Sequence, residues 1–194
     1  MENEFVSYLI TDPKYYTNDP KRFREKLIKT LDATKVHMAC FRDKTSSNFE
    51  ELAKIFVQTC EDFGVETILL NSDYELAFKL GATGVHLTSL QFDKILEAKA
   101  LNLFVIISCH SFDEIKKAQN LHANAVTFSP IFDTPNKADA KGIDLLKEAT
   151  HLYDIDIIAL GGIINEEEIK KIRKAKAKGF ASIRYFIHDA TPLL

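Results

Sequence analysis

The sequence predicts an α/β fold, a single-domain (β/α)8 TIM barrel that covers residues 1–194. Short apolar runs alternate with stretches of helical period along the whole chain, and this alternation repeats eight times. Many of the apolar runs are almost continuous, which is typical of parallel strands covered on both faces. No Gly-x-Gly-x-x-Gly follows the first run, so the alternative of an open dinucleotide-binding sheet lacks its usual signature.

Each expected strand is one of these apolar runs. The strands are expected over residues 5–10, 34–41, 65–71, 83–87, 103–108, 124–129, 155–160 and 179–186. Helices are expected between them, over residues 20–31, 48–63, 74–80, 92–100, 112–121, 143–152 and 166–175. Asp19 before Pro20, Asn48, and Asn165 with Glu168 are expected to cap three of these helices.

Few residues follow the eighth expected strand, so the last helix should be shortened or missing. The apolar surface left uncovered there would be buried by a partner subunit, as in a homodimer.

The composition points to a soluble, cytoplasmic protein. The formal net charge is -3, which gives no electrostatic reason to expect nucleic acid or a membrane surface as a partner. The three cysteines are odd in number and form no Cys-x-x-Cys pair, which argues against a disulfide framework and a zinc site. No signal peptide or membrane-spanning stretch is present.

In a (β/α)8 barrel, catalytic groups lie at the carboxyl ends of the strands and in the loops that follow. That rule selects Arg42, Lys44, Asn71, Ser108, His110, Thr134, Lys137, Gly161 and Gly162. The set contains three cations, small polar donors and glycines but few carboxylates. It therefore predicts a site for a small anionic ligand.

Each of these features also has a purely structural explanation. The glycines suit either phosphate binding or a tight turn before a capped helix. The loop over residues 129–142 is long enough for a binding loop, with Lys137 and Thr134 as phosphate donors, but a solvated loop is the alternative. Arg42 and Lys44 would bind an anion or pair with Asp43 or another neighbour. A histidine after an apolar strand, such as His110, is often a structural residue.

Six segments resemble the thiamine phosphate synthase and TenI-type thiazole tautomerase superfamily. They are YLITD (8–12), FRDK (41–44), LLNSDYELAFKLGATGVHL (69–87), SCHS (108–111), SPIFDTPNK (129–137) and ALGGI (159–163). Their order and spacing match over nearly the whole chain. The resemblance implies a (β/α)8 barrel of thiamine biosynthesis that binds a phosphorylated thiazole.

The resemblance also implies residue roles. Gly161, Gly162 and the backbone amides of Ile183 and Arg184 would hold the thiazole phosphate. In the synthase branch, Arg42, Lys44, Asn71, Ser108 and Lys137 would hold a pyrimidine diphosphate, and magnesium would be held by the Asp of an Asn-Asp pair and by another Asp shortly after the GVHL strand. The tautomerase branch needs no metal, and the histidine of Ser-x-His, here His110, would move a proton. Imidazole can take and give protons near neutral pH.

The expected magnesium ligands are missing from their usual positions. Asn71 is followed by Ser72 rather than Asp, and Asp73 would face the opposite side of an extended strand end. Leu90 stands about where the second carboxylate is expected, and the next one is Asp93. Because magnesium needs carboxylate oxygens beside a substrate phosphate, we expect no metal and no other cofactor unless Asp73 or Asp93 compensates.

The sequence therefore favours a metal-independent thiazole tautomerase, an isomerase with His110 and Ser108 as the catalytic residues. The alternative is thiamine phosphate synthase, a transferase that couples hydroxymethylpyrimidine diphosphate to thiazole phosphate and releases pyrophosphate. A second alternative is a non-catalytic or regulatory protein that binds thiamine phosphate, because Cys40, Ser72 and Arg184 replace residues usual in the superfamily and the carboxyl-terminal end of the barrel is shortened.

Overall fold

The structure, a computed structural model, is a closed barrel of eight parallel strands, and it describes residues 4–135 and 138–187. The strands are β1 (Val6–Ile10), β2 (Met38–Phe41), β3 (Thr67–Asn71), β4 (Gly84–Leu87), β5 (Phe104–Cys109), β6 (Ala125–Phe128), β7 (Asp156–Leu160) and β8 (Gly179–Ser182). Each strand pairs with the next in the sequence, and β8 pairs with β1. The expected (β/α)8 fold is confirmed, and the open sheet is excluded because the ring closes.

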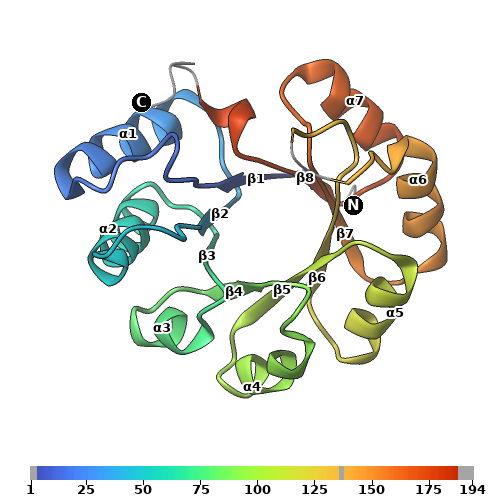
Figure 1. Cartoon of the computed structure of the whole chain (residues 1–194), viewed down its shortest axis with the longest axis horizontal. Coiled ribbons are helices and arrows are strands. Elements are labelled where there is room, and N and C mark those ends of the chain that lie inside the picture. The colour runs from blue at the N-terminus through green and yellow to red at the C-terminus, as the bar shows by residue number, and fades with distance from the viewer. Residues whose placement is uncertain (1–3, 136–137, 188–194) are drawn as a thin grey trace.

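The helices lie outside the ring of strands (Figure 1). They are α1 (Pro20–Ala33), α2 (Phe49–Asp62), α3 (Tyr74–Lys79), α4 (Ile95–Ala100), α5 (Phe112–Asn120), α6 (Gly142–Leu152) and α7 (Glu166–Lys174). Two short 3-10 turns, η1 (Phe92–Lys94) and η2 (Arg184–Phe186), complete the described elements. Among these residues, no helix is long and apolar enough to cross a membrane.

The end of the barrel differs in detail from the expectation. The strand expected over residues 179–186 ends at Ser182, because the chain turns into η2 immediately afterwards. Up to Ile187, η2 is all the helix that follows β8, in agreement with a shortened last helix. Figure 1 shows this turn between α7 and α1. The homodimer that would cover this part of the barrel stays a prediction.

Two of the three expected helix caps are confirmed. The carboxylate of Asp19 accepts a hydrogen bond from the backbone N–H of Arg22 at 2.8 Å, and Asn165 forms a capping box with Glu168. Asn48 occupies the N-cap position of α2, but its side chain makes no capping bond. The amide of Asn48 instead donates to the carbonyl oxygen of Asn18 and to Glu51, so the expected role of this side chain was wrong.

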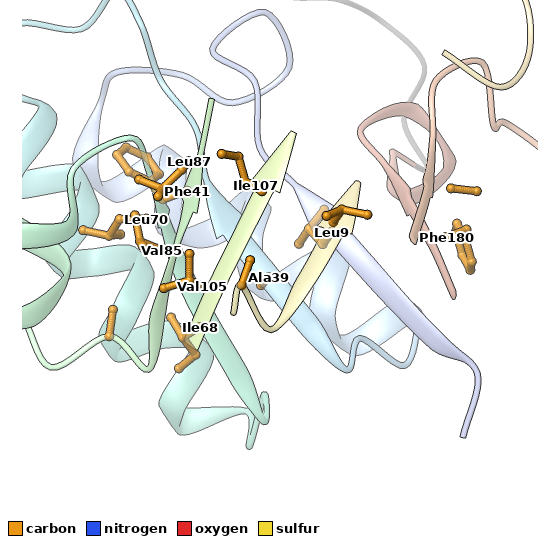
Figure 2. Packing of buried hydrophobic residues seen from close by; sticks show 14 of the residues in the cluster. Leu9, Ala39, Phe41, Ile68, Leu70, Val85, Leu87, Val105, Ile107 and Phe180 are labelled. Atoms are coloured by element: carbon orange, nitrogen blue, oxygen red, sulfur yellow. The ribbon is translucent and has the colours of Figure 1, made fainter. Parts of the chain in front are cut away.

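Two apolar layers follow from the alternation of side chains along the strands. One layer lies between the strands and the helices, and Figure 2 shows some of its members, including Phe41, Leu70 and Val85. The other fills the barrel, with the buried residues Tyr8, Ile10, Met38, Cys40, Leu69, Ile106, Ala125, Ile158 and Ala181. Toward the carboxyl ends of the strands, the next positions that face the inside of the barrel are those of Arg42, Asn71 and Ser108. The alternation thus brings these polar residues to one end of the barrel.

Candidate active site

A hydrogen-bonded polar network lies inside the barrel, and it includes Ser108. The hydroxyl of Tyr8 lies 2.7 Å from Nδ1 of His86, whose Nε2 lies 3.1 Å from the Oγ of Ser108 and 3.3 Å from the Oγ1 of Thr127. Four strands supply these side chains, so the hydroxyl of Ser108 is held by residues far apart in the sequence. Ser108 itself is only partly buried.

This network is uncharged at neutral pH. Burial, together with the positive charge of Arg42, lowers the pKa of His86 to about 4. Burial also raises the pKa of Tyr8 well above its usual value, with Cys40 adding to the effect. His86 therefore supplies fixed hydrogen bonds rather than a proton at neutral pH.

His110 lies directly after β5, and its side chain is oriented by the end of β6. Its Nδ1 is 3.0 Å from the carbonyl oxygen of Ser129. Because a carbonyl oxygen only accepts hydrogen bonds, Nδ1 carries the hydrogen, and in the neutral ring Nε2 keeps its lone pair. The backbone N–H of His110 donates to the carboxylate of Glu114, which fixes the main chain. The exposed His110 ring is therefore set up to accept a proton at Nε2.

A cleft of about 670 Å3 opens between the loops that follow β6, β7 and β8. Its lining consists of Phe132, Asp133, Thr134, Pro135, Ala138, Asp139, Gly162, Ile164, Glu168 and Arg184. Three residues selected from the sequence as phosphate contacts, Thr134, Gly162 and Arg184, thus meet in one place. Lys137, which belonged to the same set, lies outside the described residues.

The two glycines after β7 are required by the loop after β6. Gly161 and Gly162 have φ values of 97° and 72°, which L side chains rarely adopt. A Cβ on Gly161 would lie 2.8 Å from the Cα of Pro130, and one on Gly162 would lie 2.7 Å from the carbonyl oxygen of Asp133. The two glycines therefore let the loops after β6 and β7 approach each other closely, and these loops together form the cleft.

Donors for an anion are present beside this cleft. Within the described residues, the backbone N–H groups of Gly162, Ile183 and Arg184 have no hydrogen-bond acceptor. Arg184 is exposed, and it is the one cation among the described lining residues, which also include the carboxylates of Asp133, Asp139 and Glu168. The carboxylate of Glu168 is occupied by the N–H groups of Ile164 and Asn165.

Arg42 lies at the carboxyl ends of the strands but is paired with another residue of the chain. Its Nη1 donates to a carboxylate oxygen of Asp12 at 2.7 Å, and both side chains are about one-quarter exposed, 29% and 24%. The sequence suggested Asp43 or another neighbour as a partner, whereas Asp43 binds the backbone of Thr45 and Ser46. Lys44 is exposed.

Asn71 lies at the end of β3, where its side-chain amide joins this strand to β4. The amide nitrogen of Asn71 donates to the carbonyl oxygen of His86 at 3.0 Å. Ser72 follows with a φ of 69°. Its backbone N–H donates to the same His86 oxygen, so the ends of β3 and β4 are held together without a carboxylate.

The two carboxylates considered as compensating metal ligands are used elsewhere. Asp73 is the N-cap of α3, and its carboxylate accepts a hydrogen bond from the N–H of Leu76 at 2.9 Å. Asp93 is exposed and lies 3.5 Å from the ammonium group of Lys94. Among the described residues, no group of three or more His, Cys, Asp or Glu side chains could hold a metal ion. The expectation that the site needs no metal stays a prediction.

Leu90 stands about where the second carboxylate is expected from the sequence. Its side chain is 90% exposed, and the neighbouring Gln91 points to β3 instead. Nε2 of Gln91 donates to the carbonyl oxygen of Ser72 at 2.9 Å. Gln91, Asp12 and the contacts of His86 were missed in the sequence because no spacing rule links residues that meet only across the barrel.

A family profile described as thiamine monophosphate synthase matches residues 7–186. The chain belongs to the thiamine monophosphate synthase family. A putative thiamine-phosphate synthase 2 from Aquifex aeolicus is 32% identical over 185 residues, covering 93% of this chain and 96% of the relative. A thiamine-phosphate synthase from Lysinibacillus sphaericus is 36% identical over 146 residues, covering 72% of this chain and 67% of the relative. The resemblance noted in the sequence is confirmed.

Members of the thiamine monophosphate synthase family share this fold with other barrels. The thiamine phosphate pyrophosphorylase of Pyrococcus furiosus superposes with a TM-score of 0.80 at 22% identity, covering 96% of this chain and 90% of that chain. A structure titled native KDPGal superposes with a TM-score of 0.77 at 15% identity, covering 98% of this chain and 88% of that chain. At these identities the superpositions support the barrel fold alone.

Proposed function

We propose that this family member is a thiamine-biosynthesis enzyme that binds a phosphorylated thiazole in the cleft beside β7 and β8. Three features support this proposal: the family membership, the guanidinium of Arg184, and the unpaired N–H groups of Gly162 and Ile183. Backbone N–H groups and an arginine together form a donor set that suits a phosphate dianion. Thr134 lies on the third loop, where its hydroxyl donates to the carbonyl oxygen of Phe132 at 2.9 Å.

For the reaction, we propose a metal-independent tautomerisation of a thiazole carboxylate phosphate. The observation that carries this proposal is the hydrogen bond from Nδ1 of His110 to the carbonyl oxygen of Ser129. Nε2 would take a proton from one carbon of the non-aromatic tautomer and return a proton to another carbon, which makes the ring aromatic. No atom is lost and no redox partner is needed. Ser108, fixed by His86, would orient the substrate beside His110.

The residues at the expected metal positions support the same reaction. Asp73 caps a helix, Ser72 and Leu90 stand about where carboxylates were expected, and Arg42 is paired with Asp12. A diphosphate leaving group carries several negative charges, and magnesium with free cations would normally balance them. Among the described residues, Arg42 is already paired with Asp12, so it is not a free cation for such a group.

Thiamine phosphate synthase activity is the second candidate. The names of the family and of the relatives support it better than they support a tautomerase. Arg42, Lys44 and Asn71 also stand at or beyond the carboxyl ends of the strands where a diphosphate would enter. In this reaction thiazole phosphate attacks the pyrimidine methylene carbon, and pyrophosphate leaves.

Two assays with the purified protein distinguish the candidates. In the first, the non-aromatic thiazole carboxylate phosphate is supplied without metal, and formation of the aromatic product is followed by ultraviolet absorbance. In the second, thiazole phosphate and hydroxymethylpyrimidine diphosphate are supplied with magnesium, and thiamine phosphate is measured. Turnover in the first assay alone supports the tautomerase, whereas turnover in the second alone replaces it with the synthase. Binding of thiamine phosphate without turnover in either assay would favour a non-catalytic role.

A further inference from the structure

The side-chain amide of Gln91 makes three hydrogen bonds that connect two neighbouring loops. Its Nε2 donates to the carbonyl oxygen of Ser72 at 2.9 Å. Its Oε1 accepts from both the backbone N–H and the hydroxyl of Thr88, each at 3.0 Å. The donors on Thr88 and the acceptor on Ser72 determine which atom of the amide is nitrogen and which is oxygen.

These bonds complete a connection between the ends of β3 and β4. Ser72 and Asn71 both donate to the carbonyl oxygen of His86, through the backbone N–H at 2.9 Å and the side-chain amide at 3.0 Å. Gln91, in the loop after β4, adds a second connection by donating a hydrogen bond to Ser72. The same segment of β4 carries the imidazole that holds the hydroxyl of Ser108. The amide therefore holds together the loops on either side of the strand end that carries His86.

We propose that Gln91 is a positioning residue whose amide takes the place of a divalent cation in joining the loops after β3 and β4. This inference deepens the proposed metal-independent function and rests on it. A cation would join the loops by binding oxygen atoms from both of them. A carboxamide joins them by donating to an oxygen on one side and accepting from donors on the other, and it needs no ion.

The polarity of the amide makes the proposal testable. In Gln91→Glu the side chain keeps its size and still accepts from Thr88, but it loses the N–H that Ser72 needs. A carboxylate oxygen then lies against the carbonyl oxygen of Ser72, and the two oxygens repel each other. Magnesium binds such pairs of oxygens, so the variant should gain a response to the ion that the natural protein lacks.

The experiment measures the Tm of the full-length protein with EDTA and with MgCl2 or MnCl2. The matched control is Gln119→Glu, because Gln119 is also partly buried and uses its oxygen to accept from the N–H of Asp154. With EDTA, Gln91→Glu should lower Tm by roughly 5 °C, the scale expected when one hydrogen bond is replaced by a repulsive contact. Magnesium or manganese should restore a large part of that loss. Neither ion should shift the Tm of the natural protein or of Gln119→Glu.

Three outcomes would overturn the proposal. The natural protein gains Tm with either ion, Gln91→Glu behaves like Gln119→Glu in EDTA, or the loss in Gln91→Glu is unchanged by both ions. The last outcome would reduce Gln91 to an ordinary structural contact. None of these measurements uses turnover, so failure of the tautomerase proposal in the activity assays can be distinguished from failure of this one.

Discussion

The imidazole of His110, after β5, donates from Nδ1 to the carbonyl oxygen of Ser129, after β6, at 3.0 Å. This single contact fixes the tautomer of the neutral ring and leaves Nε2 as the proton acceptor. It also places the proposed base between two loops at the carboxyl end of the barrel.

Replacing His110 by alanine should lower kcat for tautomerisation by about 10²–10⁴-fold, the usual contribution of a positioned acid/base group. KM should change much less, because the proposed phosphate contacts lie on the loops after β6 to β8. Steady-state kinetics by absorbance would measure both constants. His151→Ala, a change at an exposed position on α6, is the control. Full activity of His110→Ala would remove this residue from the mechanism.

Arg184→Ala should weaken binding of the thiazole phosphate by about 10–100-fold, since a hydrogen bond to a charged group contributes roughly 1.5–3 kcal/mol. The loss follows from the cleft's charges, because among its described lining residues the variant leaves three carboxylates and no cation. Calorimetric titration with the phosphate and with the unphosphorylated alcohol would measure the change in preference. Arg24→Ala, at an exposed ion pair on α1, should alter neither affinity. An equal loss for phosphate and alcohol would contradict the predicted contact.

Gly162→Ala should destabilise the protein by about 2–4 kcal/mol, because strain at positive φ adds to a backbone clash. The new Cβ would lie 2.7 Å from the carbonyl oxygen of Asp133 and from the carbonyl carbon of Phe132. Gly64 is a matched control, since its φ is 67° but nothing lies within 4 Å of its added Cβ. Gly64→Ala should cost about 1 kcal/mol. Denaturant unfolding measures both values, and equal losses would show that the loop after β6 yields easily.

Acid should destabilise the protein through His86. The unfolded state takes up a proton near the usual pKa of 6.5, whereas burial keeps the folded pKa near 4. The stability that neutral His86 provides is therefore complete above pH 6.5 and is lost as the pH falls toward 4. The difference between the two pKa values amounts to about 3 kcal/mol.

Unfolding free energies measured between pH 7 and 4 test this prediction. His86→Gln should be less stable at pH 7 but should lose less stability on acidification than the natural protein does. His151→Gln is the control at an exposed site. Parallel pH profiles for the natural protein and His86→Gln would contradict the assignment.

The sequence determined the order of the eight strand–helix units and the end of the barrel where polar residues gather. Both follow from local rules: apolar runs form covered strands, and side chains alternate along them. Thr134 and Gly162, which line the cleft, could be selected in this way because each lies in a loop that follows a strand, whereas Arg184 was selected through the family resemblance. The family resemblance supplied the candidate reactions and the proposed proton transfer by His110.

Only the tertiary structure decided which side chains meet. Three contacts join residues from different units of the barrel. Arg42 pairs with Asp12, His86 is hydrogen-bonded to Ser108, and Gln91 donates to Ser72. A sequence pattern records distances along one strand or helix, whereas the closure of the ring sets distances between them. For that reason the sequence singled out Leu90 as the position of an expected carboxylate, and only the folded chain shows that the neighbouring Gln91 contacts Ser72.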